Sequence, residues 1–108
     1  MAEEFDKLVR DEVPTIIEAN GETPVTHVAD DEAYRRRLAE KLQEEVDEYV
    51  ESRAIDELAD VLEVVHAIRA DRGVSADELE EIREEKAVDR GRFAERIVLE
   101  RVEPGDPA

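Results

Sequence analysis

The sequence has no cysteine and no apolar run long enough to cross a membrane. Without cysteine the chain has no disulfide, no thiolate metal ligand and no cysteine nucleophile. A membrane helix needs about 20 consecutive apolar residues, and no stretch approaches that length. The N-terminal stretch also lacks the basic and apolar regions of a signal peptide. We therefore expect a soluble protein of the cytoplasm.

Basic and aromatic residues are scarce. The 108 residues include 32 acidic and 15 basic side chains, the formal net charge is -17, and only 4% of the residues are aromatic. This charge disfavours nonspecific binding to a nucleic-acid polymer or to an anionic membrane. A nucleotide can still bind, provided that a metal ion and a few well-placed basic groups contact its phosphates. The same composition suits a protein that works in high salt, as in a halophile.

The length of the chain fits one domain with a modest core. We expect this domain over residues 1–102. Residues 103–108 contain two prolines and one glycine, and they predict a disordered tail. No internal repeat divides the chain further.

Helix-boundary residues predict a mainly α-helical fold. Asp11 is a candidate cap for the first helix and Pro14 lies in its first turn. Ser75 lies three residues before Glu78, which is the spacing of a capping box for the last helix. We expect helices over approximately residues 11–20, 30–51 (capped by Asp30 or Asp31), 54–71 and 75–89.

Three other stretches have extended or β-prone character: residues 5–10, 23–29 and 96–102. We expect 96–102 to form a short terminal strand that pairs with 5–10. Pro24 argues against a central strand in 23–29. Phe93 follows a glycine closely and is expected in the core, not stacked on a base. His66 lies on an apolar face and is expected to be a core histidine, not a metal ligand.

The helix expected over 54–71 is apolar on more than one side. Its apolar residues form two groups: Leu58, Leu62 and Val65, and Val61, Val64 and Ile68. A helix that is apolar on most of its circumference is buried on most of it. Three other helices in so short a chain would struggle to surround it. We therefore expect a helical bundle completed by dimerisation, as a homodimer or higher homo-oligomer; an internally packed monomer is the alternative.

Four carboxylates interrupt the apolar faces of the two central helices. Glu45 and Glu48 are three residues apart, as are Glu57 and Asp60, so each pair lies on one helix face. Glu45 and Glu57 fall in line with apolar residues, where a carboxylate is costly unless something compensates it. Antiparallel packing across the short Ser52-Arg53-Ala54 connection would bring the four acids round a hard divalent cation, which prefers oxygen ligands.

The alternative is that these acids are a solvated face or pair with nearby arginines. Arg35, Arg36, Arg37 and Arg53 are the candidates for such pairing. The interruption of two separate apolar stripes favours the metal site over this alternative. From its helix phase alone, Glu44 is expected at the surface beside the first pair.

The chain has three lysines, Lys7, Lys41 and Lys86. Lys41 lies one turn before the acidic cluster, whereas Lys7 is near Arg10 and Lys86 is near Arg90. Phosphate oxygens need such groups in so acidic a protein. We interpret them as a phosphate clamp drawn from both ends of the chain. Scattered surface bases that make weak salt bridges are the alternative.

The acidic motif resembles that of a known enzyme superfamily. The pattern E-E-x-x-E followed by E-x-x-D, at residues 44–48 and 57–60, is similar to that of the MazG-like and phosphoribosyl-ATP pyrophosphohydrolase-like superfamily of all-α nucleotide pyrophosphatases. The flanks K-L-V-R-D-E-V-P, at 7–14, and K-A-V-D-R-G-R-F, at 86–93, resemble its small stand-alone subgroup. The stretch between Glu48 and Glu57 is shorter than in many relatives, which leaves little room for a base-recognising loop.

The resemblance implies an enzyme. Its members cleave the bond between the α- and β-phosphates of a nucleoside triphosphate or related nucleotide, with Mg²⁺ (or Mn²⁺), and release pyrophosphate and a monophosphate. By this resemblance the catalytic carboxylates are Glu44, Glu45 and Glu48. The Mg²⁺ ligands are Glu45, Glu48, Glu57 and Asp60, with Glu44 as a further ligand or base. The phosphate contacts are Lys41, Lys86, Arg90, Lys7 and Arg10.

Two alternatives remain open at this stage. One is a phosphoribosyl-ATP pyrophosphohydrolase of histidine biosynthesis, which shares the carboxylate motif but needs a site fitted to the phosphoribosyl group. The other is a regulator without catalytic activity that keeps the fold and binds metal or nucleotide. A house-cleaning nucleotide pyrophosphohydrolase is the expected function.

Overall fold

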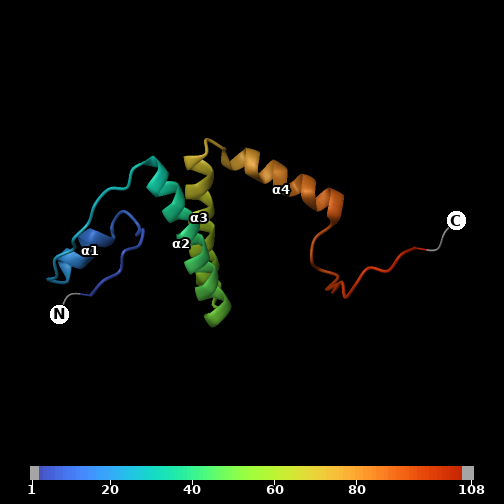
Figure 1. The fold of residues 1–108 in the computed structure, drawn as a ribbon, viewed down its shortest axis with the longest axis horizontal. Helices are drawn as coiled ribbons and strands as arrows, with labels where there is room; N and C mark the ends of the chain where they lie inside the picture. Colours follow the sequence, from blue (N-terminus) through green and yellow to red (C-terminus); the bar gives the residue numbers. More distant parts are fainter. Residues whose placement is uncertain (1–2, 106–108) are drawn as a thin grey trace. The chain divides into compact units, whose positions relative to one another are not determined.

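The computed structural model describes residues 3–105, and these contain four helices (Figure 1). The helices are α1 (Val13–Ala19), α2 (Asp31–Ser52), α3 (Ile55–Asp71) and α4 (Ala76–Arg90). The mainly α-helical fold is thereby confirmed. In the described part of the chain, none of the helices has the length and apolar character needed to span a bilayer.

The chain divides into two compact units, one on each side of the bond between Ala76 and Asp77. The first unit contains α1, α2 and α3, and the second contains nearly all of α4 and the segment that follows it. The single domain expected over 1–102 stays a prediction. Residues 106–108 of the expected tail lie outside the described residues.

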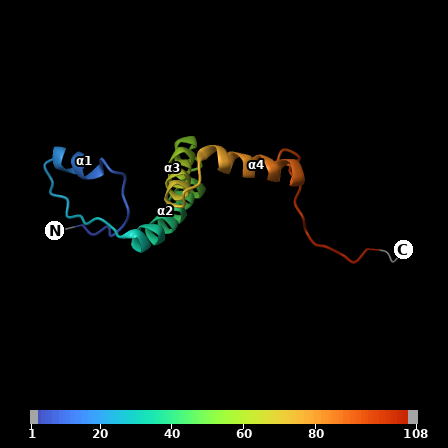
Figure 2. The same cartoon turned by 90° about the horizontal axis from the view of Figure 1, so that it is seen from above.

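In the first unit, α2 and α3 form an antiparallel hairpin, and they lie side by side in both views (Figures 1 and 2). Asp30 begins α2, because its carboxylate accepts a hydrogen bond from the Ala33 amide at 2.8 Å. Arg53 ends α2 in a left-handed conformation with a φ of 59°, and its amide donates to the Tyr49 carbonyl. Only Arg53 and Ala54 separate the two helices. This short connection was predicted from the sequence.

The hairpin buries little apolar surface. Among residues 3–105, Leu38 (3% exposed) and Val64 (8% exposed) are the only buried apolar residues, and Glu45 (7% exposed) is the only buried charged one. Several apolar side chains of the hairpin remain exposed, including Val50, Ile55, Leu58 and Leu62. The helix face that was expected to lie between two copies of the chain is therefore uncovered in a single copy.

α1 begins and ends close to the predicted residues, but its cap differs from the prediction. Glu12, not Asp11, occupies the N-cap position, and no side chain makes a capping hydrogen bond there. Pro14 in the first turn reduces the need for a cap, because it has no N–H to satisfy and its φ already suits a helix. The helix ends at Asn20, and Gly21 follows with a φ of 83°.

In the second unit, α4 is a solvated helix whose charges pair with one another. The Arg83 Nε donates to Glu80 at 2.9 Å, and the Arg92 guanidinium lies 3.1 Å from Glu84. No residue of α4 is buried. Phe93 is 97% exposed, so the prediction that it lies in the core is wrong. Residues 93–105 form no helix or strand that could cover its ring.

The predicted terminal strands are not formed: between residues 3 and 105 there is no strand. β-prone side chains stabilise a strand only where a second strand satisfies its backbone and a core covers one face. The side chains of Val25, Val28, Ile97 and Val98 are exposed, so that support is missing. The expected pairing of 96–102 with 5–10 is therefore wrong, and 5–10 makes ionic contacts with α2 and α3 instead.

Candidate metal centre

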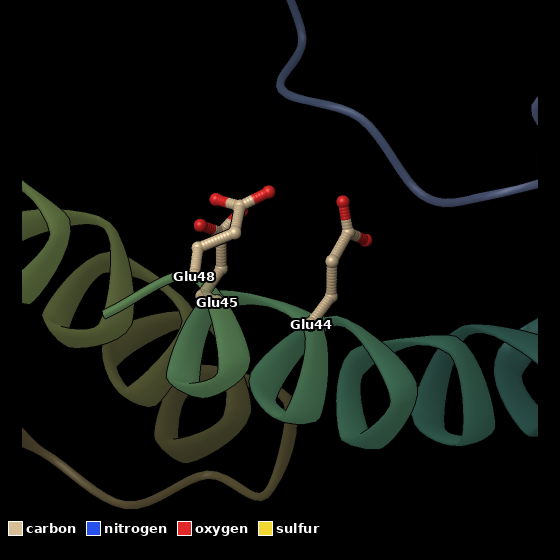
Figure 3. A group of neighbouring side chains, drawn as sticks. All are labelled: Glu44, Glu45 and Glu48. Atoms are coloured by element: carbon tan, nitrogen blue, oxygen red, sulfur yellow. The ribbon is translucent and has the colours of Figure 1, made fainter. Parts of the chain in front are cut away.

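α2 and α3 bring the acidic motif together on one face of the hairpin. Glu44, Glu45 and Glu48 project from the same side of α2 (Figure 3), and one carboxylate oxygen from each lies within 4.8 Å of the others. Glu45, Glu57 and Asp60 form a second group of the same size. Glu45 belongs to both groups and so links the two helices. The hairpin thus collects all four predicted metal ligands and Glu44.

Glu45 is the buried centre of this carboxylate face. The Lys41 ammonium, one helical turn earlier, lies 3.1 Å from its Oε1. The other oxygen, Oε2, is buried and has no hydrogen-bond partner among the described residues. A buried carboxylate oxygen without a partner is costly, because the oxygen has lost its hydration and gained nothing in return. A cation bound at this face would supply the missing partner.

The chemistry of the donors fits a hard divalent cation. Both groups consist of carboxylates alone, without histidine. Oxygen ligands suit Mg²⁺ and Mn²⁺, whereas zinc sites usually include nitrogen or sulfur. Glu48 is exposed and Glu57 and Asp60 are half-buried, so water can reach the face. Mg²⁺ usually keeps several waters, and a half-open site permits this.

Proximity of the acids raises the pKa of two of them. The pKa of Glu48 is raised by its hydrogen bond to Glu45 and by the negative charge of that residue. The pKa of Glu57 is raised by desolvation and then by the charges of Asp56 and Asp60. The negative charge of neighbouring carboxylates contributes to both shifts, after the hydrogen bond for Glu48 and after desolvation for Glu57. The face therefore carries more negative charge than its own bases neutralise.

The pKa of Glu44 is shifted in the opposite direction, because two lysines lie beside this carboxylate. Lys7 Nζ lies 2.8 Å from its Oε1, and Lys41 Nζ lies 3.5 Å from the same oxygen. Desolvation raises the pKa of Glu44, but the hydrogen bond from Lys7 and the charge of Lys41 together outweigh it and lower the pKa. The same hydrogen bond raises the pKa of Lys7. Glu44 therefore stays ionised to a lower pH than Glu48 and Glu57.

The N-terminal segment supplies a second base at the opposite side of the cluster. Arg10 Nη2 donates to Asp60 Oδ1 at 2.8 Å, and its Nη1 lies 3.8 Å from Glu63. The structure thus brings Lys7, Lys41 and Arg10 to the carboxylates. Glu63 was not singled out from the sequence, although it lies one turn after Asp60 on α3.

Three of the four arginines that offered an alternative explanation of the acids pair elsewhere. Arg35 contacts Asp71 at 3.3 Å, and Arg36 lies 3.8 Å from Glu40. Arg37 bonds Asp6, which sequence reasoning also missed, at 3.0 Å. These partners lie outside the motif. These three arginines therefore do not neutralise the motif in the structure.

The two remaining predicted phosphate contacts belong to the second unit. Lys86 is exposed on α4, and Arg90 Nε lies 4.0 Å from Asp89. Their part in a phosphate clamp stays a prediction. Lys86 and Arg90 could be predicted only from the resemblance to the known superfamily, because they lie on a different helix from the acids of the hairpin.

Two hollows of the structure lie away from the carboxylate face. A cavity of 740 Å³ lies along α4, lined by residues such as Glu81 and Val88. Another of 550 Å³ lies at the end of the hairpin far from the motif, between Arg35 and Arg72. The motif acids line neither of them. Charge and burial, not cavity shape, identify the candidate centre.

Comparison with known proteins identifies no relative. No protein-family model matches the chain, and no curated protein or solved structure matches it significantly.

Proposed function

We propose that this protein is a Mg²⁺-dependent nucleotide pyrophosphohydrolase that cleaves the α–β phosphate bond of a nucleoside triphosphate or related nucleotide. The products are a monophosphate and pyrophosphate. The observation that carries the proposal is the buried Glu45, whose Oε2 lacks a partner at the centre of two carboxylate groups. A face built of acids that repel one another is unsuited to bind a phosphate directly, but it is suited to bind the cation that a phosphate needs.

In this proposal Glu45, Glu48, Glu57 and Asp60 hold Mg²⁺, or Mn²⁺ in its place. When bound, the ion neutralises phosphate charge and lowers the pKa of coordinated water. Glu44 lies beside these four ligands and is not one of them, and we assign it to orient the attacking water and accept its proton. Water adds to phosphorus as the bridging P–O bond breaks, and the bridging oxygen leaves with the departing group.

Basic residues orient the phosphates. Lys41 is largely buried and holds Glu44 and Glu45 in place. Lys7 and Arg10 lie at the edges of the same face and are exposed, so they can turn towards phosphate oxygens. Charge-assisted hydrogen bonds of this kind fix the reacting group against the attacking water. Lys86 and Arg90 are further candidates for phosphate contact.

We also propose that the active form is a homodimer or a higher homo-oligomer. The hairpin exposes Ile55, Leu58 and Leu62. A second copy can cover these apolar side chains. The expected cytoplasmic location stays a prediction.

The experiment is an assay of pyrophosphate release from a panel of ordinary and modified nucleoside triphosphates, with and without Mg²⁺, in high salt. We expect release that requires Mg²⁺ and is lost in Glu48→Gln. Glu51→Gln, the same change at an exposed site on the same helix, is the matched control and should keep activity. Release that is unchanged in Glu48→Gln would show that the carboxylate face is not the active site. No release from any triphosphate would favour phosphoribosyl-ATP as substrate or a regulator without catalytic activity.

A further inference from the structure

Residues 5–10, which we name the N-terminal strap, are attached to both helices of the hairpin. Arg37 of α2 donates to the Asp6 carbonyl at 2.7 Å and to its carboxylate at 3.0 Å. Lys7 bonds Glu44 of α2, and Arg10 bonds Asp60 of α3. The strap is therefore held to α2 near its start and to α3 at its end, across the face that bears the acids.

Ion pairs and a hydrogen bond to a backbone carbonyl hold the strap, and Leu8 is its one half-buried apolar side chain. The side chains of Phe5 and Val9 are exposed, and the Phe5 ring contacts Lys7 Nζ at 5.8 Å from its centroid. No strand pairing fixes the backbone of the strap. Exposed ion pairs contribute little to stability and weaken with salt. The strap can therefore separate from the face without unfolding the hairpin.

The strap pairs with residues of the two carboxylate groups. Glu44 belongs to one group and Asp60 to the other, and each accepts a hydrogen bond from a strap cation at 2.8 Å. A divalent cation held among these acids would lie close to Lys7 and Arg10 and repel both of them. It would also neutralise the carboxylates that hold Lys7 and Arg10. The strap cations and a divalent ion therefore compete for one charge cluster.

We propose that the N-terminal strap is an internal counter-cation that covers the carboxylate face when the face is metal-free and is displaced when a divalent cation binds. This inference rests on the metal site of the proposed function. Displacement frees Lys7 and Arg10 from the carboxylates, so that they can meet phosphate oxygens only after the ion is in place. The strap thus sets the order in which ion and phosphate are bound.

Limited trypsin digestion measures displacement directly, because trypsin cleaves the bond between Lys7 and Leu8 inside the strap. The initial rate of this cleavage is measured by mass spectrometry in EDTA and in Mg²⁺, with NaCl added to equal ionic strength. Cleavage after Arg101, an exposed residue of the second unit, is the internal control. We expect Mg²⁺ to accelerate cleavage after Lys7 several-fold and to leave the control unchanged. An unchanged or slower rate after Lys7 would overturn the proposal.

Metal affinity gives the second readout. We expect Lys7→Met to increase the affinity for Mn²⁺, followed by electron paramagnetic resonance, about two- to fivefold, which is the size expected when one exposed ion pair no longer competes. Arg36→Met removes the same charge from α2 away from the motif, and it should change the affinity less. Equal effects of both variants would show that only net charge acts, and the strap would have no special role.

The same experiment separates the two proposals. A wild-type protein that binds neither Mn²⁺ nor Mg²⁺ overturns the metal site of the proposed function, and the strap proposal with it. A wild-type protein that binds the ion while trypsin cleavage after Lys7 does not respond overturns the strap alone. Circular dichroism of both variants confirms that they keep their helices.

Discussion

The carboxylate face of the hairpin and the solvated helix α4 are both rich in acidic residues but differ in character. α4 carries Asp77, Glu80 and Glu84 at helical spacing, as α2 carries its acids. All residues of α4 remain unburied, and Arg83 neutralises Glu80 within the helix and lowers its pKa. Acids spaced by helical turns therefore do not by themselves make a site.

The difference lies in the position of the acids relative to the apolar stripe. Glu45 lies in line with Leu38 and is buried with it, whereas Glu80 faces solvent beside its own arginine. Burial removes water from Glu45 and leaves Oε2 without a partner. The pKa values reflect this contrast, because neighbouring acids raise the pKa of Glu48 while a base lowers that of Glu80. One acidic region contains a buried carboxylate oxygen without a partner, and the other contains none.

The largest expected effect is on turnover. Glu45→Gln should lower kcat/KM more than about 100-fold, beyond the 10–100-fold loss that is typical of a group that only supports a metal ligand. Glu80→Gln is the matched change in α4 and should leave kcat/KM unchanged. Steady-state pyrophosphate release in Mg²⁺ measures both. Similar losses of kcat/KM in the two variants would show that the two acidic regions do not differ in function.

Local signals in the sequence predicted the helices and the meeting of the acids. Asp30 capped α2 as expected, and the short Ser52-Arg53-Ala54 connection placed Glu45 opposite Glu57 and Asp60. Both features depend on residues within a few turns of each other. The phase of Glu45 in its helix also predicted its burial, which the structure confirms.

The sequence did not predict what depends on distant parts of the chain. The contact of Arg10 with Asp60 spans 50 positions, and no periodic pattern records such a long-range contact. The β-prone residues 96–102 formed no strand because strand formation depends on a partner, which local propensity cannot supply. Likewise, Phe93 was expected in a core that the second unit does not build.

A smaller effect is expected on stability as a function of pH. The pKa of Glu48 is raised in the folded protein, so between its ordinary and its raised value the folded state binds more protons than the unfolded chain. The free energy of unfolding should therefore increase as the pH falls through this window. This added stability disappears again when the pH rises through the raised pKa. Thermal unfolding in EDTA from pH 7 to pH 5 measures this rise in Tm.

Variants of the two regions test the origin of that pH dependence. Glu48→Gln should show a weaker rise in Tm than the wild type, because the group that takes up the proton is gone. Glu80→Gln should show the full rise, because the pKa of Glu80 is lowered and its contribution changes only at more acidic pH. A full rise in Glu48→Gln would mean that repulsion within the carboxylate face does not cause the effect.

The smallest effect is expected in α4. Arg83→Met removes the base that contacts Glu80 and Glu84, but these residues are exposed, and exposed pairs contribute little to stability. We expect Tm to change little and the Mg²⁺ affinity to stay unchanged. A clear fall in Mg²⁺ affinity would show that the second unit contributes to the metal site.

The most direct test of the central claim is a calorimetric titration of Mg²⁺ into the metal-free protein. The wild type and Glu80→Gln should bind Mg²⁺ with the same affinity, and Glu45→Gln should show no saturable binding while keeping its helices. Equal binding by Glu45→Gln and the wild type would contradict the claim that the buried carboxylate, with its unpartnered oxygen, is the centre of a metal site.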